Sequence, residues 1–265
     1  MVKLPEFTMR QKLYDSQHDR LVYIGEPANE DFWDNQWERD ERLVRRTNHF
    51  VRRHTLRYLD PPACVIDAGC GLAHSVFSLH KAGFNAWGID FAAKTVDFVN
   101  SVAPELKVRL GDVRQLPFQD GFFDGVWSLG VIEHFFDGYD NIVCETRRVL
   151  KPGGYAFVTA PAMSPLRRLK ALCGSYATFT GDSCNFYQFA LSQQSVIDRF
   201  TSGGFVLVET RRRGGVMGLN DELKVPLLSN IFSAQHPIVK GLKIGLDQIL
   251  TPLSFHTQFY VFKAV

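Results

Sequence analysis

Short apolar runs alternate with amphipathic stretches between residues 63 and 161 of the chain. Five runs have the length and composition of buried strands, namely ACVID (63–67), NAWGID (85–90), LKVRLGD (106–112), FDGVWSLG (123–130) and GGYAFVTAP (153–161). The stretches between them, such as HSVFSLHKAG and NIVCETRRVL, place apolar residues at helical spacing. Strands that alternate with helices in this way predict an α/β fold, in which helices cover both faces of a parallel sheet.

The alternation continues after residue 190 with one further helix and strand. In SQQSVIDRFTSGGFVLVET (192–210), Ser192 has the position of a helix N-cap and Gly203 that of the residue that ends the helix. HTQFYVFKAV (256–265) alternates as a last strand. The segments at about 162–190 and 214–255 do not fit the alternation, and we predict that they are insertions after the fifth and sixth strands.

The first 55 residues have a different pattern. Aromatic and charged residues recur there at roughly helical spacing, and Leu43, Phe50, Val51 and Leu56 fall on one apolar stripe. A Pro-Pro pair then marks a break. We therefore predict an N-terminal helical cap at residues 1–55, followed by an α/β domain at residues 56–265 that carries both insertions.

Composition and charge add limits to this picture. The chain has 265 residues, of which 45% are hydrophobic and 22% charged, so one α/β domain with a large core is expected. A formal net charge of +2 gives no reason to expect a polyanionic partner. The five cysteines are odd in number and never spaced C-x-x-C, which argues against a disulfide framework and a structural zinc site.

The sequence also bears on location. Its first twenty residues lack the apolar core of a secretory signal, and nowhere do eighteen apolar residues run together. We therefore expect no transmembrane segment and a reduced, cytoplasmic compartment.

The stretch VIDAGCGLAHSV (65–76) contains the first candidate for chemistry. In a parallel sheet, ligands bind beyond the carboxyl ends of the strands, and Asp67 ends the first strand. Gly69 and Gly71, with Cys70 between them, predict a tight turn that a ligand can approach closely and that presents free N–H groups at a helix N-terminus. These N–H groups would hold a carboxylate of the ligand, and Asp67 would accept from its amine.

Two further acids follow the next two strands. Asp90 comes nineteen residues after Gly71, where a carboxylate can accept from both hydroxyls of a ribose. Asp112 is placed to accept from an exocyclic amino group, and Val113 adds a backbone N–H and an apolar contact. An amino acid, a ribose and an adenine in this order make up S-adenosylmethionine.

With these residues the sequence resembles the class I S-adenosylmethionine-dependent methyltransferases. The likeness is strongest to their small-molecule branch (methyltransferase type 11, similar to enzymes of ubiquinone and menaquinone biosynthesis). Four stretches carry it, from about Ala63 to Pro161: VIDAGCG, GID, GDVRQLPFQDGFFDGVWSLGVIEH and RVLKPGGYAFVTAP. The resemblance implies a seven-stranded, mostly parallel sheet with an antiparallel last strand, and residues 56–265 as the cofactor-binding domain. It also implies that the cofactor site is lined by Asp67, Gly69, Cys70, Gly71, Asp90, Phe91, Asp112, Val113 and Leu129.

Three other interpretations stay open at this stage. A nicotinamide-binding domain shares the glycine turn and the following acid, but its motif needs a small residue where His74 stands. An RNA or other nucleic-acid methyltransferase would use the paired arginines, such as Arg167-Arg168, although the [DN]-P-P-[YF] motif is missing after the fourth strand. A binding protein that has lost turnover would keep the same cofactor residues.

Methyl transfer needs few obligatory side chains, because alignment and water exclusion supply much of the acceleration. His134, after the fourth strand, is the candidate general base, and its alternative role is to cap a helix or to support the cofactor loop. A related quinone-precursor branch binds a metal through Glu-x-x-Glu-His at this point. Gly130 replaces the first glutamate here, which leaves Glu133 and His134, and we predict no metal.

The acceptor site is expected to be formed by the segments outside the resemblance. Trp33, Trp37, Tyr176 and Tyr187 are candidates for an apolar or ring-stacking pocket, with core packing as the alternative for each of them. The expected substrate is a small molecule, such as a sugar, a lipid precursor or a secondary metabolite, and no nucleic acid is expected.

Residues 236–250 (HPIVKGLKIGLDQIL) predict one more helix. Val239, Leu242, Leu246 and Ile249 fall on one of its faces. Such a face predicts a contact with its own domain or with a second subunit in a homodimer, and a peripheral membrane contact is the alternative.

Overall fold

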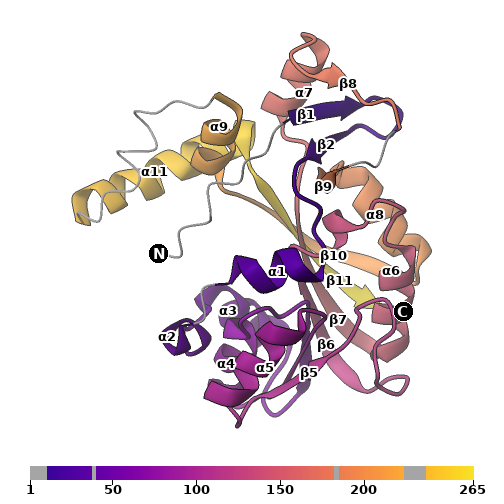
Figure 1. The fold of residues 1–265 in the computed structure, drawn as a ribbon, viewed down its shortest axis with the longest axis vertical. Helices are drawn as coiled ribbons and strands as arrows, with labels where there is room; N and C mark the ends of the chain where they lie inside the picture. The colour runs from indigo at the N-terminus through magenta and orange to yellow at the C-terminus, as the bar shows by residue number, and fades with distance from the viewer. Residues whose placement is uncertain (1–10, 38–39, 182–184, 224–236) are drawn as a thin grey trace.

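The centre of the protein is a seven-stranded sheet (Figure 1). The computed structural model describes residues 11–37, 40–181, 185–223 and 237–265. The strands of this sheet, in spatial order, are β10 (Phe205–Arg213), β11 (Thr257–Ala264), β7 (Leu150–Pro161), β6 (Phe123–Leu129), β3 (Cys64–Ala68), β4 (Asn85–Asp90) and β5 (Lys107–Leu110). Only β11 runs antiparallel to its neighbours, so the predicted fold class is confirmed.

Helices cover both faces of the sheet because its strands are apolar on both sides. Along β6, Val126 packs into the core beneath α6 (Asp140–Val149) and α8 (Gln193–Ser202), whereas Trp127 packs into the core on the opposite face. That opposite core is covered by α3 (His49–Tyr58), α4 (His74–Lys81) and α5 (Ala93–Val102). Ser192 caps α8 by accepting from the Ser195 N–H at 3.3 Å, and Gly203 ends it, as predicted.

The N-terminal part differs from the predicted helical cap. Residues 11–24 form a hairpin of β1 (Gln11–Asp15) and β2 (Arg20–Ile24), and only then do α1 (Glu30–Gln36) and α2 (Glu41–Val44) follow. The hairpin is the centre of a second sheet, in the order β8–β1–β2–β9, whose outer strands β8 (Ala177–Thr178) and β9 (Phe186–Ala190) come from the insertion after β7. Two segments that are distant in sequence therefore bury each other's apolar residues.

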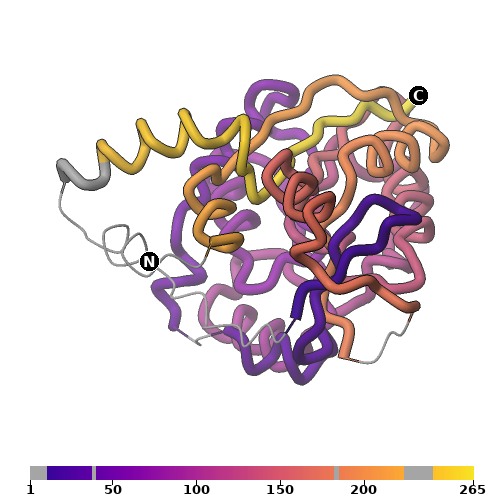
Figure 2. Tube along the Cα trace, turned by 90° about the horizontal axis from the view of Figure 1, so that it is seen from above, coloured from indigo at the N-terminus to yellow at the C-terminus, as the bar shows by residue number. Residues whose placement is uncertain are grey.

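The second insertion contains α9 (Gly215–Leu223) and α11 (Pro237–Ser254). Figures 1 and 2 both show α11 extending away from the body of the protein. The predicted apolar face is exposed at Leu242 (68%) and Ile249 (76%), because α11 packs on α9 through another face, where Asp247 accepts from the Val216 N–H. Thus these two side chains make no core contact with the described part of the chain. None of the helices within the described ranges has the length and apolar content needed to cross a bilayer.

Helix α7 (Pro165–Leu172) connects the two sheets to α9.

The predicted N-terminal cap and the two predicted insertions each include positions outside the described residues. These positions are 1–10, 38–39, 182–184 and 224–236. These positions include one of the five cysteines, Cys184.

Candidate active site

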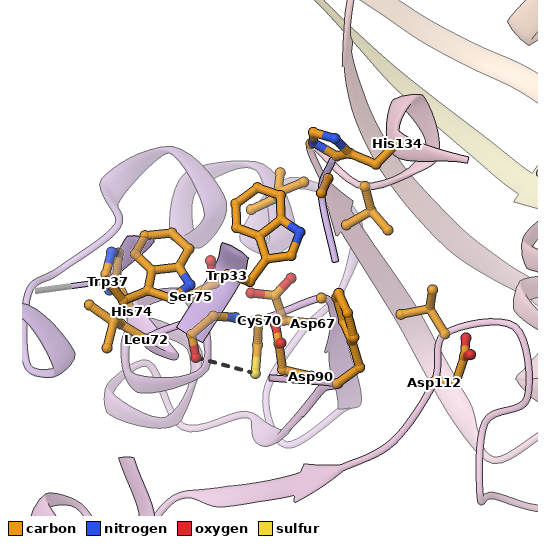
Figure 3. Close-up of a pocket in the computed structure, with 18 of the residues that line it drawn as sticks. Trp33, Trp37, Asp67, Cys70, Leu72, His74, Ser75, Asp90, Asp112 and His134 are labelled. Atoms are coloured by element: carbon orange, nitrogen blue, oxygen red, sulfur yellow. Dashed lines mark hydrogen bonds between the residues drawn. The ribbon is translucent and has the colours of Figure 1, made fainter. Parts of the chain in front are cut away.

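A cavity of about 430 Å³ lies at the carboxyl ends of β3, β4 and β6, beneath α1. Of the residues predicted from the sequence, the cavity is lined by Trp33, Trp37, Asp67, Gly69, Cys70, Gly71, Asp90, Phe91, Asp112, Val113, Leu129 and His134. Figure 3 shows the Asp67 and Asp90 side chains close together, with Asp112 on one side of them and Trp37 on the other. The structure therefore gathers into one cavity residues from positions 33 to 134 of the sequence.

The glycine turn has a different role from the one predicted. The N–H groups of Gly69 and Cys70 both donate to the Ile89 carbonyl oxygen, at 2.8 and 3.0 Å, and the Gly71 N–H donates to Asp90 at 2.7 Å. None of the three is free for a ligand. N–H groups that lack an intrahelical partner lie instead in the first turn of α4, which follows directly.

The two glycines are required by conformation and by space. Both have positive φ, +88° at Gly69 and +48° at Gly71, in the region that side chains disfavour. A Cβ at Gly69 would come within 2.5 Å of Val131, and one at Gly71 would come within 2.8 Å of the Trp37 ring. Both neighbours line the cavity, so a larger residue at either glycine would push a wall of the cavity out of place.

Asp67 is the most unusual group in the cavity. It is 2% exposed, and its Oδ1 has no hydrogen-bond partner among the described residues. Burial raises its pKa to about 7, a hydrogen bond from Ser75 lowers the pKa in part, and the Asp90 charge raises it further. A buried carboxyl oxygen without a donor is costly, and a ligand that brings a positively charged donor relieves that cost.

Asp90 holds the two loops of the cavity together. Besides the Gly71 N–H, its carboxylate accepts from the Ala92 N–H at 3.0 Å. Burial raises the pKa of Asp90, and the hydrogen bonds from Ala92 and Gly71 offset part of that rise. Phe91, 41% exposed, follows directly and forms an apolar wall of the cavity.

Asp112 lies in the cavity as predicted, but its carboxylate already has a partner. Both oxygens of Asp112 accept from the Arg114 guanidinium, at 2.6 to 3.0 Å, and these hydrogen bonds hold the pKa of Asp112 below its usual value. Val113 and Leu129 provide apolar contacts beside it. An adenine amino group at this point would share the Asp112 carboxylate with Arg114.

His134 is the last residue of η1 (Ile132–His134), the short 3-10 helix that follows β6. Its Nδ1 lies 2.9 Å from the carbonyl oxygen of Tyr187, which can only accept, so Nδ1 carries the proton. Burial lowers the pKa of His134 to about 4, and the imidazole is therefore neutral near pH 7. Its other nitrogen, Nε2, is an acceptor with no hydrogen-bond partner among the described residues.

Glu133, next to His134, is a buried carboxyl group. Its side chain is 3% exposed, and burial raises its pKa to about 8, so that the carboxyl is protonated near neutral pH. Across the described ranges, no three side chains of His, Cys, Asp or Glu gather closely enough to hold a metal ion.

Two of the four predicted acceptor residues lie at the cavity and two do not. Trp33 and Trp37 stack at 6.2 Å between ring centroids, and the Trp33 ring meets His134 edge-on at 5.1 Å. Tyr176 instead donates to Glu222 at 2.5 Å, away from the cavity. Tyr187 is buried against Phe32, and its contribution is the carbonyl oxygen that orients His134.

Sequence reasoning missed Asn48 and Ser75, which line the cavity beside Asp67. Asn48 caps α3 by accepting from the Val51 N–H at 3.2 Å, and its amide nitrogen donates to Ser75 Oγ at 3.3 Å. Asn48 precedes an amphipathic run, which signals only a helix N-cap. The other lining residues not predicted from the sequence are Ala28, Leu72, His74, Arg114, Gly130, Val131 and Phe135.

The residues of the cavity fit S-adenosylmethionine. Asp67 offers a buried acceptor for the amine of the methionine part, and the first turn of α4 offers N–H groups for its carboxylate. Asp90 and Asp112 line the same cavity, where the sequence predicts the ribose and the adenine.

Comparisons with known proteins agree with this fit. Residues 66–158 match the methyltransferase domain family. A probable S-adenosylmethionine-dependent methyltransferase of Mycolicibacterium smegmatis is 33% identical over 119 residues, which are 43% of this chain and 46% of that protein. The 27-O-demethylrifamycin SV methyltransferase of Amycolatopsis mediterranei is 29% identical over 54% of each chain. A probable tRNA methyltransferase 9B of Bos taurus is 32% identical over 44% of this chain and 25% of its own.

The matched regions span about half or less of these relatives' lengths. Among solved structures, the geranyl diphosphate C-methyltransferase of Streptomyces coelicolor, determined with Mg²⁺, geranyl diphosphate and S-adenosylhomocysteine, superposes with a TM-score of 0.53. It shares 18% sequence identity, over 81% of this chain and 76% of that one, and this likeness concerns the fold alone.

Proposed function

We propose that this chain is a class I S-adenosylmethionine-dependent methyltransferase that transfers the methyl group to a small molecule, because residues 66–158 match the methyltransferase domain family. The observation that carries the proposal is Asp67, a buried carboxyl with an unpaired oxygen at the wall of the cavity. It supports an ammonium-bearing ligand over a dinucleotide, whose pyrophosphate would be repelled by a carboxylate at this position.

The cofactor, when bound, supplies a methyl group on a sulfonium that is already a good leaving group. The remaining work of the protein is to bind, to align and to exclude water. Asp67 and Asp90 fix the two ends of the methionyl-ribose part, and Trp37 covers the glycine turn. Trp33 and His134 then face the acceptor side of the cavity.

His134 favours an acceptor that carries a hydroxyl group. The Tyr187 carbonyl fixes the Nδ1–H tautomer, so Nε2 is available to accept the acceptor's proton or to orient its oxygen. The walls near His134 are Val131, Phe135 and the edge of Trp33, all apolar. We therefore assign to this side an uncharged, ring-bearing or aliphatic alcohol or phenol of small size.

The test is calorimetric titration with S-adenosylmethionine, S-adenosylhomocysteine and NAD in parallel. Micromolar binding of the two sulfur compounds and none of NAD is the expected result. Transfer of a labelled methyl group is then followed on a panel of hydroxylated small molecules and on bulk tRNA. Transfer to tRNA alone would contradict the small-molecule assignment. Binding without transfer to any acceptor would favour a protein that has lost turnover.

Replacing His134 with alanine should lower kcat by about a hundredfold, because Nε2 orients the acceptor's oxygen, and misplacing a reacting atom costs on that order. The affinity for S-adenosylhomocysteine should stay within about twofold, since His134 lies on the acceptor side of the cavity.

In the unchanged protein, kcat should show no loss attributable to His134 above about pH 5, because its pKa of about 4 leaves the imidazole neutral there. Equal turnover by the variant would remove His134 from the reaction.

Binding of S-adenosylmethionine should release a proton from Asp67. In the free protein its pKa is about 7, so at about pH 6 the carboxyl is mostly protonated. An ammonium beside it favours the carboxylate, which lowers the pKa and expels the proton. Calorimetry in two buffers of different ionisation enthalpy should give nearly one proton at about pH 6 and nearly none at about pH 8.5. The Asp67→Asn variant is the control, and proton release that persists in it would assign the effect to another group.

A further inference from the structure

Helix α5 has no N-cap of its own. The residue at the N-cap position is Ala92, which has no side-chain acceptor. The missing acceptor comes from Asp34 in α1, sixty residues earlier in the chain. One oxygen of Asp34 accepts from the Thr95 N–H at 2.9 Å and from the Thr95 hydroxyl at 3.1 Å, and the other accepts from the Lys94 N–H at 3.3 Å. A carboxylate at this position also interacts favourably with the helix dipole.

This contact is buried and directional. Asp34 is 3% exposed and Thr95 is fully buried, so water does not compete for these hydrogen bonds. The first turn of α5 begins directly after Asp90 and Phe91, which line the cavity. Asp34 therefore attaches α1 to the segment that is assigned to the ribose of the cofactor.

Helix α1 and its C-cap residue carry the two indoles of the cavity. Trp33 and Trp37 flank Asp34 in sequence and line the cavity, and the Trp37 ring fills the space next to Gly71. On the other side of α1, Phe32 packs edge-on against Tyr187 at 5.6 Å. The helix thus bridges the cofactor side, through Asp34, and the acceptor side, through Phe32.

We propose that Asp34 is a positioning residue for methyl transfer: by capping α5 from α1, it holds Trp33 and Trp37 over the cofactor. The apolar contact of Phe32 holds only the acceptor end of α1. Without Asp34 the Trp37 end loses its attachment to α5, and the cofactor loses one wall of its cavity. This inference rests on the proposed function, because it concerns the same cavity.

The experiment compares four variants of the full chain. Asp34→Ala removes the cap. Asp34→Asn keeps one capping oxygen for the Thr95 N–H and hydroxyl and loses only the longer bond to the Lys94 N–H, and asparagine is an N-cap residue as good as aspartate. Thr95→Val removes the hydroxyl donor and keeps the backbone donor. Asp31→Ala is the matched control, since Asp31 is an exposed acid of the same helix. Urea unfolding of each variant establishes that it is folded.

Two readouts are followed, one without and one with cofactor product. In the ligand-free protein, hydrogen exchange of the α1 amides should quicken by about tenfold in Asp34→Ala. The Kd for S-adenosylhomocysteine should rise by about tenfold in Asp34→Ala, less in Thr95→Val, and stay near that of the unchanged protein in Asp34→Asn and Asp31→Ala.

The outcomes separate this inference from the proposed function. Unchanged exchange in α1 of Asp34→Ala would overturn the positioning role, whether or not the protein binds S-adenosylhomocysteine. An equal loss of affinity in Asp34→Asn and Asp34→Ala would also overturn it, because the cap would then not be the cause. If the unchanged protein binds neither sulfur compound, the proposed function fails, and with it the part of the inference that concerns the cofactor.

Discussion

Replacing Asp90 with alanine should weaken the binding of S-adenosylhomocysteine by a hundredfold or more. Two effects add in this variant. The ribose hydroxyls lose a charged acceptor, and hydrogen bonds to charged groups contribute about 1.5 to 3 kcal/mol each. The Gly71 and Ala92 N–H groups, which donate to Asp90 at 2.7 and 3.0 Å, also lose their partner. The glycine turn and the start of α5 are then no longer joined. The measurement is the calorimetric Kd.

Asp90→Asn separates these two effects. The amide oxygen can still accept from one N–H, so the loop junction is partly kept while the charge that favours the ribose is lost. We expect an intermediate loss of affinity, on the order of tenfold. Asp97 lies in α5, outside the cavity, and the Asp97→Ala variant should bind S-adenosylhomocysteine as the unchanged protein does. If Asp90→Ala retains full affinity, Asp90 is a structural residue and the ribose is held elsewhere.

The positions of the acids could be predicted from the sequence because strand ends are predictable. A short apolar run with a β-branched core identifies β3 and β4, and in a parallel sheet their carboxyl ends must meet at one edge. Asp67 and Asp90 can therefore be placed side by side from the strand order, and this step needs no knowledge of side-chain packing. The direction of the last strand followed from the resemblance rather than from the pattern.

The hydrogen bonds of the glycine turn could not be predicted in this way. The sequence shows that Gly69 and Gly71 permit positive φ, but not where their N–H groups point. In the structure those groups join β3 to β4 through Ile89 and Asp90. The preference for glycine comes from Val131 and Trp37, which pack against the turn from segments that are distant in sequence.

The helical stripe in α3 shows a similar limit. The spacing predicts Leu56 on the buried face, but Leu56 is 40% exposed and Thr55 is fully buried. The Thr55 hydroxyl accepts from the Trp127 indole N–H at 2.9 Å and donates to the Val51 carbonyl oxygen at 2.9 Å. A polar residue is therefore preferred where the sheet beneath presents a buried indole donor, and a pattern of apolar residues cannot reveal this.

The N-terminal hairpin could not be identified because its partner strands are distant in sequence. The two strands within residues 11–24 are short, and the turn between them is charged. They are stable as strands only when β8 and β9 pair with them. Tyr176 and Tyr187 lie outside the lining of the cavity for the same reason. The second sheet buries Tyr187 against Phe32, and it directs Tyr176 to Glu222.

A buried ionic cluster joins this second sheet to α7 and α9. Arg167 has no exposed surface, and it donates to Asp221 at 2.8 Å, to Glu222 at 3.0 Å and to the Ala162 carbonyl oxygen at 2.6 Å. Lys12 of β1 donates to both acids as well. Burial raises the pKa of Glu222, but the Lys12 and Arg167 charges and hydrogen bonds from Lys170 and Tyr176 together hold it well below its usual value. Both acids are therefore ionised and depend on their cations.

Replacing Arg167 with methionine should lower the free energy of unfolding by about 3 kcal/mol, because buried oxygens of Asp221, Glu222 and Ala162 each lose a donor, and an unsatisfied buried group costs about 1 to 3 kcal/mol. Arg168→Met is the matched control in the adjacent position. Arg168 pairs with Asp19 at 2.7 Å, but both side chains are substantially exposed, and such a pair contributes about 1 kcal/mol or less. Urea unfolding of the ligand-free protein measures both values. Equal losses in the two variants would mean that Lys12, Lys170 and Tyr176 satisfy the acids without Arg167. The connection between the second sheet and α9 would then not depend on the Arg167 guanidinium.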